Sequence, residues 1–333
     1  MTRRDPRNGT RPAVLAAVLA GALVLAACGD DDSDATPTTT AAPAVTTTPG
    51  GTQAGPPLKF KPLDVGGPLT VAALENDDIQ VALLFSSDGA IAAKGFVVLE
   101  DDKKLQPVEN LVVVGRQDKL TDAVDAVLEP ALSTLTTAEL TELNKRMNVD
   151  KEDPADVAQS WLEAGGFLEG GDSLDGQSFT VGSSNFNEQE LASSMVGQLL
   201  EANGADVTEK FKIGAREVVA PALENGDIDL YVEYVGSYLT FLGGTPTTDL
   251  DASVADLSAR AAAKGVVVGT VAPAEDKNAF VVTRETADEY GLAKVSDLAG
   301  VPDQLTLGGP PECPQRPLCI GGLQSVYGLQ FDL

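Results

Sequence analysis

The sequence predicts an α/β fold composed of two facing lobes. Short β-rich runs alternate with helical patterns after residue 57, an alternation that favours strands of mostly parallel sheets separated by helices. Roughly 275 residues remain beyond that point, enough to build two lobes with cores of their own. An internal repeat then indicates that the two lobes are related.

The repeat is an eight-residue segment that occurs twice, far apart in the chain. Ala73-Leu-Glu-Asn-Asp-Asp-Ile-Gln80 matches Ala222-Leu-Glu-Asn-Gly-Asp-Ile-Asp229 at six of eight positions. In both copies a helix end and a turn precede a buried strand, and both continue to an aromatic residue in register, Phe85 and Tyr234. Ligands of open α/β sheets bind beyond the carboxyl ends of strands, so these aromatics mark an expected cleft. A generic helix–turn–strand pattern recurring by chance is the alternative.

The other elements carry clear start and stop signals. A strand is predicted at 179–182, followed by a helix that begins near Asn187 and stops at Asn203-Gly204, a typical C-terminal cap. Further strands are predicted at 206–213 and 228–232. Asp153-Pro154 begins another helix, with Asp as N-cap and Pro in the first turn. The apolar stripes of both helices are interpreted as core.

The chain begins with a segment typical of export. Four arginines precede an apolar run from Ala13 to Ala27, which is short for a membrane span and has signal-peptide flanks. Small residues before Cys28 and Gly29 after it resemble a bacterial lipobox, so we expect residues 1–27 to be a signal peptide and Cys28 to carry lipid on an extracytoplasmic membrane face. A plain signal peptide with a chance cysteine is the alternative. Residues 28–57 then form a Thr/Pro/Ala-rich tether without apolar periodicity.

Charge and composition exclude several function classes. The net charge is −27, and removing residues 1–27 takes away four arginines and one aspartate, which changes it to −30. Such a surface repels nucleic acid and anionic lipid head groups, so neither is an expected partner. The chain has no histidine, hence no Ser-His or Cys-His nucleophile pair and none of the commonest metal ligand. We therefore expect no enzyme, no cofactor and no metal; an enzyme of the same architecture that uses carboxylates or lysine alone is the alternative.

Two cysteines remain once Cys28 is lipidated. Cys313 and Cys319 form an even pair with a spacing that suits a small disulfide loop in an exported protein. A zinc site is disfavoured, because two cysteines without histidine do not complete a coordination shell.

Several segments resemble the osmoprotectant-binding proteins of ABC importers, which bind glycine betaine, choline and related quaternary amines. The matching segments are Thr180-Val-Gly-Ser-Ser-Asn-Phe-Asn-Glu-Gln189, Gly226-Asp-Ile-Asp-Leu-Tyr-Val-Glu-Tyr-Val-Gly-Ser237, Ala272-Pro-Ala-Glu-Asp276, Leu307-Gly-Gly-Pro-Pro-Glu312, Tyr327-Gly-Leu-Gln-Phe331, Phe85-Ser-Ser-Asp-Gly89 and Val98-Leu-Glu-Asp-Asp102. Together they cover nearly all of 58–333. The resemblance implies a bilobal, type II-like periplasmic-binding-protein fold that passes a small solute to an ABC permease.

The two halves occur in the reverse of the family's order, which implies a circular permutation. The segment resembling the family's first half is 177–333, and its second half corresponds to 58–168. Because domain termini often lie close together, a short loop can join them while another loop is cut. Lobe A is then expected at about 96–277 and lobe B at about 58–92 plus 281–333, with a two-strand hinge near 91–95 and 275–280. A monomer is expected; a swapped dimer is the alternative.

The resemblance also implies ligand-binding residues. A quaternary ammonium is recognised by aromatic faces, carboxylates and carbonyls, and a ligand carboxylate by Arg and hydroxyl donors. The residues implied are Tyr234 and Phe85 in an aromatic cage, Ser237 and Arg316 on the ligand carboxylate, and Asp276 through its backbone carbonyl.

Three positions depart from the family pattern. Ser184 stands where a lysine is common, and Asn278 and Glu109 stand where cage aromatics are expected. We expect a cage reduced in this way to bind a bulky trimethylammonium group less well, with Glu109 pairing with a cation by charge instead. A polyamine-like, amino-acid-like or otherwise modified solute is therefore an alternative. An envelope lipoprotein that acts as a sensor or protein scaffold is a second alternative, from a different class.

Overall fold

The computed structural model describes residues 53–63 and 67–333, all of which belong to one compact unit. The expected signal peptide, the lipidation site Cys28 and most of the tether lie outside these residues. Within the described part of the chain no helix is both long enough and apolar enough to cross a bilayer.

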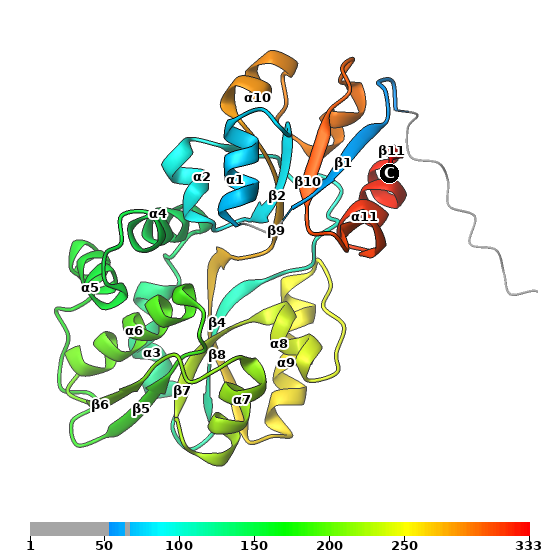
Figure 1. The fold of residues 1–333 in the computed structure, drawn as a ribbon. Helices are drawn as coiled ribbons and strands as arrows, with labels where there is room; N and C mark the ends of the chain where they lie inside the picture. Colours follow the sequence, from blue (N-terminus) through cyan, green and yellow to red (C-terminus); the bar gives the residue numbers. More distant parts are fainter. Residues whose placement is uncertain (1–52, 64–66) are drawn as a thin grey trace, which may run out of the picture. The chain divides into compact units, whose positions relative to one another are not determined.

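Lobe A is built on a five-stranded sheet with the order β6-β5-β7-β4-β8. Its elements are β4 (Asn110–Arg116), α3 (Asp122–Leu132), α4 (Thr137–Asn148), α5 (Pro154–Ala164), β5 (Ser178–Gly182), α6 (Asn187–Ala202), β6 (Asp206–Lys210), α7 (Arg216–Asn225), β7 (Leu230–Tyr234), α8 (Val235–Phe241), α9 (Leu250–Ala262) and β8 (Val266–Glu275). Helices cover both faces of the sheet (Figure 1).

Lobe B is built on a six-stranded sheet with the order β11-β1-β10-β2-β9-β3. Its elements are β1 (Leu58–Pro62), α1 (Pro68–Glu75), β2 (Val81–Phe85), α2 (Gly89–Lys94), β3 (Val97–Val98), β9 (Asn278–Val282), α10 (Arg284–Tyr290), the 3-10 turn η1 (Val295–Gly300), β10 (Thr306–Gly309), the 3-10 turn η2 (Cys313–Gln315), α11 (Ile320–Tyr327) and β11 (Phe331–Asp332). The two ends of the folded chain meet here, because β1 pairs in parallel with β11.

Both sheets are mixed, with fewer parallel pairs than the alternation alone predicts. β5 is parallel to β6 and β7, whereas β4 is antiparallel to β7 and β8. In lobe B, β9 is antiparallel to β2 and β3. The antiparallel pairings involve β4, β8 and β9, the strands that enter or leave a lobe, and their direction is set by the path between lobes.

Each sheet buries an apolar core on both faces, as expected for a sheet between helices. In β4, Leu111 and Val113 join the core beneath α3 and α6, while Val112 and Val114 join the core beneath α7 and α9. Side chains alternate between faces along a strand, so a continuous apolar run serves two cores.

The expected local elements are confirmed with small shifts. The repeat places α1 before β2 in lobe B and α7 before β7 in lobe A, with Phe85 and Tyr234 as the last residues of equivalent strands. The Asp153 side chain accepts a hydrogen bond from the Ala155 amide as an N-cap. The disulfide between Cys313 and Cys319 is present.

The first crossing between the lobes lies later in the chain than the expected 91–95. Gly95 ends α2 in a left-handed conformation, β3 then pairs with β9, and the chain keeps hydrogen bonds to lobe B as far as Gln106. The crossing is formed by residues 107–109, where the Val108 amide donates to the Thr247 carbonyl of lobe A. The second crossing, residues 276–277, falls inside the expected 275–280. The continuous part of lobe A therefore starts near Asn110 rather than near residue 96.

A close contact between α2 and α4 joins the lobes away from these crossings. A Cβ atom on Gly89 would lie 2.5 Å from the Lys145 amide nitrogen and 2.6 Å from its Cα. The Asn144 Nδ2 donates to the Ser87 carbonyl at 2.8 Å beside this contact. The absence of a side chain at residue 89 therefore permits the two helices to approach.

We predict that Gly89→Ala lowers the free energy of unfolding by about 1–3 kcal/mol, because the new methyl group meets backbone atoms that cannot rotate away. Urea denaturation followed by circular dichroism measures the change. Gly300→Ala is the matched control, since its Cβ has nothing within 4 Å, and equal stability of both variants would contradict the contact.

Candidate functional site

Two adjoining cavities open between the lobes. The Tyr234 cavity has a volume of about 310 Å³ and the Asn144 cavity one of about 480 Å³. Both are lined by Phe85 from lobe B, by Asn185 and Phe186 from lobe A, and by Asp276 from the second crossing. The shared lining makes them two parts of one cleft.

The fold brings these side chains together because strands of both lobes end at the cleft. Tyr234 is the last residue of β7 and Phe85 the last of β2. Asn185 and Phe186 lie in the turn between β5 and α6, also beyond the carboxyl end of a strand. Open α/β sheets place ligands at this edge.

Aromatic side chains from the two lobes meet across the cleft. The rings of Phe85 and Phe186 lie 6.5 Å apart at an interplanar angle of 88°, an edge-to-face arrangement. Phe186 is 48% exposed, whereas Tyr234 is buried. The exposed faces available to a cation are therefore those of the two phenylalanines.

A buried carboxylate lies beside them. Glu188, in the first turn of α6, accepts a hydrogen bond from the Tyr234 hydroxyl at 2.7 Å and one from Asn144 Nδ2 at 2.5 Å. Burial raises its pKa, and the hydrogen bonds from Ser87, Tyr234 and Asn144 oppose that shift. The pKa of Tyr234 is raised in turn, by burial and by the negative charge of Glu188, so its hydroxyl stays a donor.

Asp276 supplies a second carboxylate to the cleft. Its Oδ1 is buried and has no hydrogen-bond partner. Burial raises the pKa of Asp276 well above the usual range for aspartate, and the nearby charge of Glu188 raises it further, against hydrogen bonds from Ser87. A cation bound between Asp276 and Glu188 would offset both the cost of burying their charges and the repulsion between them.

A third carboxylate lies behind Ser237. Glu109 accepts hydrogen bonds from the Ser237 amide and from its hydroxyl, both at 2.9 Å. Burial raises the pKa of Glu109, and these two bonds and the charge of Arg216 lower it. Both donors of Ser237 are thus occupied by a side chain of the protein itself.

Arg216 lines the Tyr234 cavity but is not a free cation. Its Nε and Nη2 donate to the two oxygens of Glu233 at 2.7 and 2.9 Å. A bidentate pair of this kind holds both planar groups in place. The charge of Arg216 is therefore neutralised by Glu233. The other charged groups that line the cavity are carboxylates.

The structure brings together most of the residues singled out in the sequence. Five of them line the Tyr234 cavity: Phe85, Ser184, Tyr234, Ser237 and Asp276. Ser184 is buried there and its hydroxyl donates to Gln189 Oε1. Glu109 reaches the cavity through Ser237.

Arg316 and Asn278 are not among the side chains that line the cleft. Arg316 lies inside the disulfide loop, 56% exposed at its side chain, and forms an ion pair with Glu312 at 2.6 Å. The first residue of β9, Asn278, lies in a separate cavity of about 370 Å³ beside the crossings, where its Nδ2 is 3.5 Å from Gln106 Oε1.

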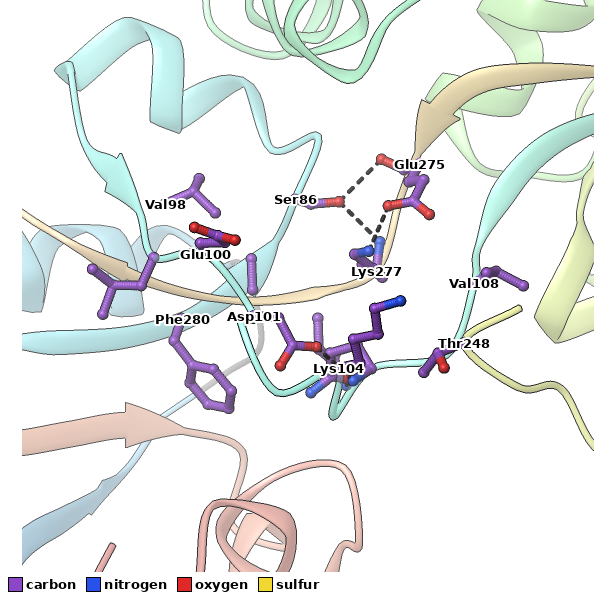
Figure 2. A pocket seen from close by; sticks show the side chains of 14 residues that line it. Ser86, Val98, Glu100, Asp101, Lys104, Val108, Thr248, Glu275, Lys277 and Phe280 are labelled. Carbon is purple, nitrogen blue, oxygen red and sulfur yellow. Dashed lines mark hydrogen bonds and ion pairs between the residues drawn. The ribbon is translucent and has the colours of Figure 1, made fainter. Parts of the chain in front are cut away.

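That hinge cavity is shown in Figure 2. The Ser86 hydroxyl donates to the Glu275 carbonyl and accepts from the Lys277 amide, both at 3.0 Å, and Lys277 pairs with Glu275 at 2.5 Å. These contacts fix the second crossing to the end of β2. The cavity is therefore a feature of the hinge.

Comparison with known proteins identifies the family. The family of substrate-binding domains of ABC-type glycine betaine transport systems matches residues 58–164 and 177–333. The chain belongs to this family.

Individual relatives are distant. The chain is 28% identical over 165 residues to the glycine-betaine-binding protein of Pseudomonas aeruginosa, covering 46% of this chain and 53% of that one. It is 28% identical over 114 residues to the carnitine transport binding protein OpuCC of Listeria monocytogenes, covering 34% and 36%. The matches thus span about half or less of each relative's length.

Solved structures are more distant still. The periplasmic murein tripeptide binding protein MppA, in its unliganded open form, aligns over 65% of this chain and 51% of its own, with 12% identity and a TM-score of 0.34. A superposition of that quality adds nothing to the fold seen in the two sheets.

Four residues of this substrate-binding domain's cleft escaped the sequence analysis: Phe186, Glu188, Asn144 and Arg216. The first two lie within the segment 180–189 that carries the family resemblance, so their neighbourhood was a usable signal. Asn144 lies on an ordinary amphipathic helix and Arg216 opens another. Nothing in their local sequence distinguishes them from solvated surface residues.

We predict that Asp276→Asn stabilises the ligand-free domain at neutral pH. The raised pKa means that the folded state favours protonated Asp276, so the carboxyl's contribution is fully present below its unfolded pKa of about 4 and is lost as pH rises. The neutral amide avoids that loss, and its advantage should disappear in acid. Unfolding measured from pH 3 to pH 8 tests this; a variant that is less stable at pH 7 would contradict it.

Proposed function

We propose that this chain is the lipid-anchored, extracytoplasmic solute-binding component of an ABC importer. It captures a small amine-bearing solute, of the class of glycine betaine, choline and carnitine or another small cation, between its two lobes and presents it to the permease. One observation carries the proposal: a cleft lined from both lobes by two phenylalanines and by the carboxylates of Glu188 and Asp276.

The chemistry of the cleft suits a cation. Phe85 and Phe186 present aromatic surface, on which a desolvated cation gains up to about 2 kcal/mol. Burial raises the pKa of Glu188 and of Asp276 because it disfavours their ionised forms. A bound cation would stabilise those ionised forms. Closing two lobes about a hinge is an established way to enclose a solute, and the crossings at 107–109 and 276–277 provide one.

A circular permutation within a single chain is part of the proposal. The family matches in two segments, and the gap at 165–176 between them falls where the original ends would be joined. The pairing of β1 with both β10 and β11 supports completion of lobe B within one molecule. The protein would then act as a monomer.

We predict that a cationic amine stabilises the purified full-length chain against heat. A ligand at a hundredfold excess over its Kd adds nearly 3 kcal/mol, so a thermal-shift panel of choline, glycine betaine, carnitine, polyamines and amino acids should contain at least one clear responder. Phe186→Ala should weaken that binding about tenfold, whereas Phe241→Ala, at an exposed position outside the cleft, should not. No response to any member, together with recovery of a protein partner, would favour a sensor or scaffold instead.

We predict that Cys28 carries the membrane anchor. Cells expressing the full chain should incorporate labelled palmitate into the protein and hold it in the membrane fraction. Cys28→Ser should abolish both, because stable anchoring requires acyl chains on that sulfur. Cys313→Ser is the control, since its disulfide lies within the folded part and its loss leaves the lipobox intact. Labelling that persists in Cys28→Ser would refute the assignment.

A further inference from the structure

The two donors of Ser237 are already used. The resemblance assigns this serine to the carboxylate of a zwitterionic ligand, yet its amide and hydroxyl both donate to Glu109 at 2.9 Å. The fit is close, because a Cβ on Gly236 would lie only 3.0 Å from Glu109 Cδ. Glu109 therefore occupies the position that the resemblance assigns to a ligand carboxylate.

Every cation of the described cleft already has a carboxylate partner that balances its charge. Arg216 is bound by both oxygens of Glu233. Arg316 is paired with Glu312 in the disulfide loop and does not line either cavity. The remaining charges of the lining are carboxylates, those of Asp88, Glu188, Glu217 and Asp276. A negatively charged group would meet repulsion without an unpaired cation to offset it.

The cleft also lacks a hydrogen-bond donor at one defined atom. Asp276 Oδ1 is buried and unpartnered, although Asp276 lines both cavities. Buried polar atoms are normally satisfied, and the oxygens of an ionised carboxylate can only accept, so the ionised form of Asp276 requires a donor here. A trimethylammonium group carries no N–H and would leave this oxygen unpaired, whereas a protonated amine supplies the missing donor.

We propose that the cleft selects a carboxylate-free ammonium ion that donates an N–H hydrogen bond to Asp276, with Glu109 taking the place of a ligand carboxylate. The inference rests on the proposed solute-binding function and narrows its substrate class. Small primary, secondary or tertiary amines in their protonated form fit it. Zwitterions such as glycine betaine and carnitine do not.

The proposal has two requirements, the absence of a carboxylate on the ligand and the presence of an N–H donor. Isothermal titration of the full-length chain with three ligands of nearly equal size, namely dimethylaminoethanol, choline and glycine betaine, tests each requirement separately. Choline and glycine betaine share a trimethylammonium group and differ in the carboxylate. Protonated dimethylaminoethanol and choline share the hydroxyethyl arm and differ in one N–H. We expect dimethylaminoethanol to bind about tenfold more tightly than choline because it adds one charge-assisted hydrogen bond, and choline about tenfold more tightly than glycine betaine because the latter adds a carboxylate that the lining repels.

Variants assign these differences to atoms. Asp276→Asn should reduce dimethylaminoethanol to the affinity of choline. Glu109→Ala, which frees both donors of Ser237, should raise the affinity for glycine betaine about tenfold, whereas Glu109→Gln keeps an acceptor in place and should not. Melting temperatures without ligand check that each variant folds, and the ranking of ligands on the unaltered chain stands without any variant.

Two results overturn the inference in distinguishable ways. Glycine betaine binding at least as tightly as choline, with the affinity lost in Arg316→Ala, would mean that Arg316 reaches the ligand carboxylate; the solute-binding function would then stand and this substrate class would fall. Absence of binding by all three ligands and by the wider amine panel would remove both proposals together.

Discussion

The structure depends on the pairing of two short segments that cross between the lobes. The Asp276 amide donates to the Glu109 carbonyl at 3.0 Å, next to the aligned residues Asn110 and Glu275. Lobe B takes its strands from both ends of the chain, so its halves are held together by β2–β9 and β10–β2 pairing. The shape of the cleft therefore depends on the pairing of the two crossings, which sets the position of one lobe relative to the other.

The same crossings carry functional side chains. Glu109 leads into β4 and Asp276 follows β8, so two carboxylates of the site sit on the hinge itself. Their burial raises the pKa of each. Movement of the lobes changes how well water solvates Glu109 and Asp276, and therefore changes their pKa values. The charge of the site thus depends on how far the lobes are closed.

Much of the fold was predictable because its signals are local. The capped start at Asp153-Pro154, the stop after α6 and the duplicated helix–turn–strand unit depend on neighbouring residues alone. The first crossing was misplaced because β3 is only two residues long, and its pairing with β9 depends on contacts remote in sequence. The residues of the site show the same difference. Tyr234 and Phe85 were predictable because they end strands, whereas the roles of Asn144 and Arg216 depend on how α4 and α7 pack.

The contact between α2 and α4 restricts the way in which the cleft can open. Two crossings alone would form a simple flexible joint, with freedom to bend in several directions. The close approach of Gly89 to the Lys145 backbone adds a further point of attachment. Rotation of one lobe against the other is least obstructed about an axis that passes through the crossings and through the contact between α2 and α4. The lobes should therefore open about this axis, and the solute should enter the cleft from the side opposite to it.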